Sequence, residues 1–63
     1  MLITKPNLTS PDDFYAQLLA AHEGLSKADS DALNARLILL MANHIGDESV
    51  LNAALNAAQT RKD

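Results

Sequence analysis

The sequence contains no cysteine, and its 63 residues include two glycines, two prolines and no tryptophan. Without cysteine the chain can form neither a disulfide bond nor a thiolate metal site. A domain this short buries only about 60% of the surface that its unfolded chain exposes. Small domains usually compensate with disulfides, a metal, oligomerisation or very regular helix packing. Oligomerisation and helix packing are therefore the sources of stability to look for.

Aromatic residues and positive charge are also scarce. Phe14 and Tyr15 are the only aromatics, too few to form a stacking platform for nucleic-acid bases. The five basic residues are scattered and the formal net charge is −3, whereas nucleic-acid binders carry a basic patch. The sequence has neither the run of roughly 20 apolar residues that a membrane span needs nor a signal peptide. We expect a soluble, cytoplasmic protein that binds neither nucleic acid nor a membrane.

Capping residues and helical spacing predict three helices, at residues 11–23, 27–45 and 48–59. Each begins after a residue that can cap a helix N-terminus, and the first two end at a glycine, which favours the left-handed conformation of a C-cap. The caps are Ser10, Ser26 and Asp47, and the glycines are Gly24 and Gly46. The short connections favour antiparallel neighbours.

The second helix is apolar on nearly every side, which is typical of a central, buried helix. Arg36 is the only charged residue between Asp31 and Asp47. The fold prediction is all-α, a small antiparallel three-helix assembly. Residues 1–9 form an extended N-terminal arm, residues 10–60 the helical domain and residues 61–63 a C-terminal tail. The predicted core contains Phe14, Leu18, Leu33, Leu37, Leu40, Leu51 and Leu55.

Catalytic chemistry finds little support in the residue pattern. His22 and His44 each fall in the last turn of a helix, roughly 18 Å apart in an antiparallel pair, so one chain cannot use both on one metal. Six of the eight acidic residues lie at or near helix starts, where capping and the helix dipole explain their placement. We therefore expect no catalytic residues, no cofactor and no metal, with structural or interface roles for both histidines.

An exposed face of the second helix is the predicted partner-binding surface. Two short neighbouring helices cannot cover an apolar arc that runs most of the way round a longer one, and exposed apolar patches usually mark interaction sites. The predicted partner-binding residues are Arg36, Leu39, Asn43, Ala35 and Ala42, with Ala28 and Ala32 on the same face. In this hypothesis Arg36 and Asn43 supply polar specificity at the rim. Another interpretation of Arg36 is that it belongs to a solvated stripe with Asp29 and Asn43, or that its stem lies along the apolar surface with its charge in water. The alternative is that the N-terminal arm covers the face through Leu2, Ile3 and Leu8.

Several segments of the chain also resemble a known family. These are residues 6–8, 12–15, 21–25, 33–37 and 40–47, and the most distinctive are Asn34-Ala35-Arg36-Leu37 and Asn43-His44-Ile45-Gly46. Over roughly residues 6–58 the chain resembles the short bacterial proteins grouped as domain of unknown function 2783. The resemblance implies no activity and no catalytic residues. It does imply a setting, because such proteins are often encoded beside flavin-dependent aromatic hydroxylases or other enzymes of aromatic breakdown.

Two functions follow as hypotheses. The first is a small non-catalytic helical binding module, an accessory subunit that docks onto a larger enzyme, for which the resemblance suggests a flavin-dependent aromatic hydroxylase. The second is a self-associating homo-oligomer with a structural or regulatory role. An enzyme acting alone fits less well, because 63 residues leave little room for a closed pocket of the usual 300–1,000 Å³ or so. The partner is thus expected to be another protein or a second copy.

Overall fold

The computed structural model describes residues 1–59, which contain three α-helices and no strand. These are α1 (Pro11–His22), α2 (Lys27–Ile45) and α3 (Glu48–Ala58). The all-α prediction is confirmed, and each helix end lies within one residue of its predicted position. The tail predicted at residues 61–63 lies outside the described residues.

Side-chain caps fix the starts of α2 and α3. The Ser26 hydroxyl accepts a hydrogen bond from the backbone N–H of Asp29 at 3.2 Å. The carboxylate of Asp47 accepts from the backbone N–H of Ser49 at 3.0 Å and of Val50 at 3.3 Å, and from the Ser49 hydroxyl at 2.8 Å. Such caps satisfy the N–H groups that the first turn of a helix leaves without a partner.

The start of α1 differs from the prediction. The side chain of Ser10 makes no capping hydrogen bond, and only its backbone carbonyl accepts, from the N–H of Phe14 at 3.1 Å. Pro11, which has no N–H to satisfy, removes part of the need for a cap. Gly24 and Gly46 adopt positive φ angles of 79° and 70°, which an L side chain would strain. Gly46 is the C-cap of α2, whereas the C-cap of α1 is Glu23, one residue before Gly24.

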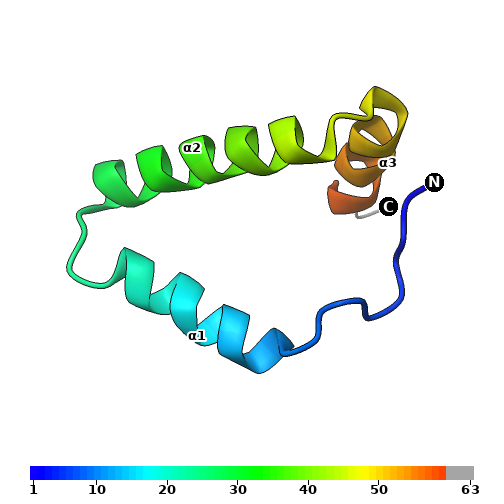
Figure 1. Cartoon of the computed structure of the whole chain (residues 1–63). Coiled ribbons are helices and arrows are strands. Elements are labelled where there is room, and N and C mark those ends of the chain that lie inside the picture. Colours follow the sequence, from blue (N-terminus) through cyan, green and yellow to red (C-terminus); the bar gives the residue numbers. More distant parts are fainter. Residues whose placement is uncertain (60–63) are drawn as a thin grey trace, which may run out of the picture.

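The helices are splayed rather than bundled. Figure 1 shows α1 and α2 diverging from the turn that joins them, with α3 set across the far end of α2. Residues 1–10 form no helix and run from the start of α1 toward α3. The radius of gyration is 13.7 Å, whereas a compact chain of this length has one of about 10.6 Å. The predicted antiparallel bundle is therefore not confirmed, because α1 and α2 separate as they leave the turn.

The prediction of a buried core is wrong for the described chain. No residue among 1–59 is buried, and α2, predicted to be the central buried helix, is exposed along most of its length. Within the predicted core, Leu18, Leu33, Leu37 and Leu51 are half-buried, whereas Phe14, Leu40 and Leu55 are exposed at 42%, 70% and 61%. Phe14 and Leu40 are exposed because α1 diverges from α2, which leaves the facing sides of these two helices uncovered.

The cap of α3 makes this helix sensitive to acid. The hydrogen bonds from the Ser49 hydroxyl and the Val50 N–H favour the charged carboxylate and hold the pKa of Asp47 below its ordinary value of 3.8. A group whose pKa is lowered by folding stabilises the fold above its unfolded pKa, and the stabilisation is lost as the pH falls through the folded pKa. We expect acid titration below pH 4 to reduce the helicity of α3 first, measured by amide chemical shifts.

Two substitutions at Asp47 separate the effect of its capping hydrogen bonds from the effect of its negative charge. Asp47→Asn should keep a capping oxygen but remove this pH dependence, whereas Asp47→Ala should reduce α3 helicity at every pH. An unchanged acid transition in Asp47→Asn would show that another group causes it.

Candidate protein-binding surface

Large apolar side chains are exposed around the whole circumference of α2. Leu39 and Leu40 keep 69% and 70% of their surface exposed, and Ile38, on another side of the helix, keeps 60%. Full burial of one such side chain is worth roughly 1.5–3 kcal/mol. The described chain therefore leaves a large part of its apolar surface in contact with water.

A hollow of about 360 Å³ lies on one side of α2, lined by Arg36, Leu39, Leu40 and Asn43. At 3.6 residues per turn these four positions span an arc of about 100°. We call these four residues the α2 stripe. The stripe contains three of the five residues predicted to bind a partner. It also contains Leu40, which sequence reasoning placed in the core.

The other two predicted residues lie apart from the stripe. Ala35 is exposed and Ala42 is half-buried, and neither lines the hollow. On the helix they sit about 100° from the centre of the stripe. The structure therefore brings Arg36, Leu39 and Asn43 together, and places Ala35 and Ala42 on an adjoining side.

A second open hollow of about 360 Å³ lies between α1 and α2 and adjoins the stripe. Arg36 and Leu40 line both hollows, so the apolar surface continues from the stripe to α1. The full lining is Phe14, Gln17, Leu18, Ala21, Leu33, Arg36, Leu37 and Leu40. Both hollows are shallow and mainly apolar, the character of a docking surface more than of a reaction site.

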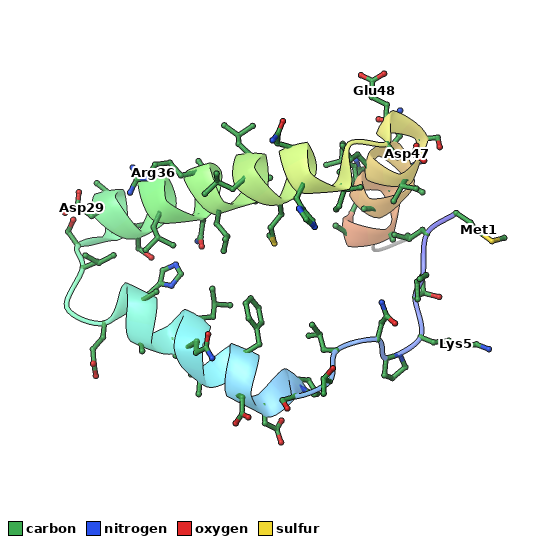
Figure 2. All side chains as sticks on the ribbon, in the orientation of Figure 1. Met1, Lys5, Asp29, Arg36, Asp47 and Glu48 are labelled. Atoms are coloured by element: carbon green, nitrogen blue, oxygen red, sulfur yellow. The ribbon has the colours of Figure 1, made fainter. Side chains whose placement is uncertain are left out.

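The polar ends of the stripe have no partners inside the described chain. Among residues 1–59, no hydrogen bond or ion pair joins Arg36 or Asn43 to another side chain. Figure 2 shows Arg36 on α2, well apart from the acidic Asp47 and Glu48 at the start of α3. The guanidinium and the amide are thus available to groups on another molecule.

Residues 1–9, predicted to form an arm, do not cover the stripe. Ile3 and Leu8, which the alternative hypothesis placed over this face, are themselves 64% and 60% exposed, and Leu39 remains open. Leu2 is half-buried, and the arm runs near α3 (Figure 1). The described residues therefore leave the stripe uncovered.

One side-chain hydrogen bond ties α1 to α2. Nε2 of His22 lies 2.8 Å from Oδ1 of Asn34, and Nδ1 lies 2.8 Å from the backbone carbonyl of Leu18. The Leu18 carbonyl and Oδ1 of Asn34 can both only accept, so Nδ1 and Nε2 each donate in this geometry. His22 thus holds the two helices near their shared turn. No spacing rule identifies Asn34 as the partner of His22 from the sequence alone.

The remaining ionisable groups form no reactive cluster in the part of the chain described. No group of three or more histidine and acidic side chains among residues 1–59 is placed to hold a metal ion. The only ion pair in this range is Lys27–Asp31, at 2.8 Å on the exposed surface, a type worth little in stability. In the same range no helix is both long enough and apolar enough to cross a membrane.

Comparison with known proteins places nearly the whole chain in one family. The family model described as "Protein of unknown function (DUF2783)" matches residues 2–60. No curated protein matches the chain, and no solved structure does. The predicted resemblance is therefore confirmed. The comparisons identify the family of the chain but assign no activity to it.

The His22–Asn34 contact generates a prediction about the hairpin of α1 and α2. His22→Ala and Asn34→Ala should each lower the free energy of unfolding by about 1 kcal/mol, the net worth of a typical hydrogen bond. The double variant should lose little more than His22→Ala alone, because His22→Ala already removes the contact with Asn34, together with the bond to the Leu18 carbonyl. Urea unfolding followed by circular dichroism measures these values.

His44→Ala is the matched control, because His44 is exposed and its side chain makes no hydrogen bond among residues 1–59. Strictly additive losses in the double variant would contradict a shared contact between His22 and Asn34.

Proposed function

The chain belongs to the DUF2783 family of proteins of unknown function, and we propose that it is a small, non-catalytic helical binding module. In this proposal another protein chain covers the exposed apolar surface of α2. That chain is either a second copy or a larger enzyme that this module serves as an accessory subunit. A flavin-dependent aromatic hydroxylase is the enzyme class that the family resemblance suggests.

The observation that carries the proposal is that no residue among 1–59 is buried. A chain gains stability mainly by removing apolar surface from water, and this one leaves a large part of that surface exposed. The large exposed side chains on α2 are Ile38, Leu39, Leu40, Met41 and Ile45. A protein surface that covers one side of α2 would supply part of the missing burial.

The arrangement of polar groups supports a non-catalytic role. His22 is already engaged by Asn34 and the Leu18 carbonyl, and Asp47 caps α3. The hollows on α2 carry one charged residue, Arg36, and no acidic residue or histidine. General acid–base chemistry needs such groups within hydrogen-bond reach of a substrate.

A substitution at the centre of the stripe tests the proposal. Leu39→Glu removes an apolar contact and places an unpaired charge in the covered surface, so association should weaken at least about tenfold. In size-exclusion chromatography of host extract, the wild type should elute in an assembly larger than the 6.8 kDa chain and Leu39→Glu should not. Circular dichroism should show similar helix content for both.

Asn52→Glu is the matched control, because Asn52 is exposed on α3, away from the stripe. This variant should associate like the wild type. The proposal fails when the wild type elutes at the mass of one chain both in extract and after concentration in pure form.

A further inference from the structure

The chain exposes more surface than a compact monomer of its mass, by an amount comparable to a dimer interface. The chain exposes 5813 Å², whereas a compact monomer of 6.8 kDa exposes about 4,000 Å². The excess is about 1,800 Å² on each copy, so an interface that covered a little over half of it would bury about 2,000 Å² in total. Obligate homodimers bury about 2,000–5,000 Å².

The α2 stripe is its own complement when two copies run antiparallel. Consider a two-fold axis that passes between Leu39 and Leu40. Each residue of one copy then lies at the same position along the helix pair as the residue of the other copy for which the two residue numbers add up to 79. Arg36 of one copy is then level with Asn43 of the other, and the leucines of both copies meet at the axis. A two-fold interface uses the same patch twice, so it requires this kind of self-matching.

Resting on the proposed function, we propose that the partner at the stripe is a second copy of this chain, docked antiparallel along α2. The Arg36 guanidinium has only donors, and the Asn43 amide carries a carbonyl oxygen that can accept from it. Each interface contains this pair twice. Neither side chain has another side-chain partner among residues 1–59, so pairing breaks no existing contact there.

The charges favour this orientation over a parallel one. In the antiparallel pair the two Arg36 residues are seven positions apart along the axis, about 10 Å, which is close to the screening length in 0.1 M salt. A parallel pair would place one guanidinium directly beside the other. Between Asp31 and Asp47 no acidic residue lies on α2, so no carboxylates oppose each other along the stripe.

Exchanging Arg36 and Asn43 tests whether the partner is a second copy and whether the two α2 helices pair antiparallel with these residues opposite each other. Sedimentation equilibrium of the pure protein should show a wild-type dimer. Asn43→Arg places two guanidinium groups at each contact and should raise the dimer Kd about tenfold or more. Arg36→Asn leaves two amides at each contact and should raise it by a smaller factor. The double variant, Arg36→Asn with Asn43→Arg, restores the pair in reverse and should return the Kd to within about threefold of wild type.

Circular dichroism on each variant verifies that the helices remain, since all the substitutions are on the exposed surface of α2. A double variant as weak as Asn43→Arg would overturn the antiparallel register. A wild-type protein that is monomeric when pure but part of a larger assembly in host extract would overturn self-pairing and leave the binding module standing. A monomer in both settings would overturn both proposals.

Discussion

The length of α2 relative to its neighbours controls the whole molecule. This helix has 19 residues and extends about 28 Å, whereas α1 and α3 have 12 and 11 residues and extend about 18 and 16 Å. Because α1 diverges from the turn and α3 crosses the far end, neither neighbour runs beside the middle of α2 (Figure 1). The leucines there remain exposed, and no core forms among residues 1–59.

Local signals determine most of what could be predicted from the sequence. Ser26, Gly46 and Asp47 act through hydrogen bonds and backbone angles within a few residues, so they place helix ends without any knowledge of tertiary packing. Ser10 shows the limit of such signals, because a residue able to cap does not have to do so. The angle between α1 and α2 depends on contacts such as His22–Asn34, which no local spacing specifies.

The sequence predicted only part of the candidate surface, because the exposed side of α2 also depends on how its neighbours pack. Helical periodicity gives the angular position of a residue but not which side a neighbouring helix covers. Leu40 lies close in angle to Leu33 and Leu37, so it was assigned to the core. It lies further along α2, however, where α1 has moved away, and it is exposed. The same effect moves the centre of the open surface from the Ala35 and Ala42 side to the α2 stripe.

Helix formation and assembly are separable in this architecture. The capping hydrogen bonds and glycine turns act within each helix end and need no partner chain, so they stabilise helices in a single copy as well. Burial of the leucines on the stripe depends on whatever covers α2, and binding to the folded form adds to its stability. In the proposed binding role, a change on the stripe would alter the mass of the assembly and its cooperative unfolding more than its helix content, whereas a change at a cap acts on helix content first.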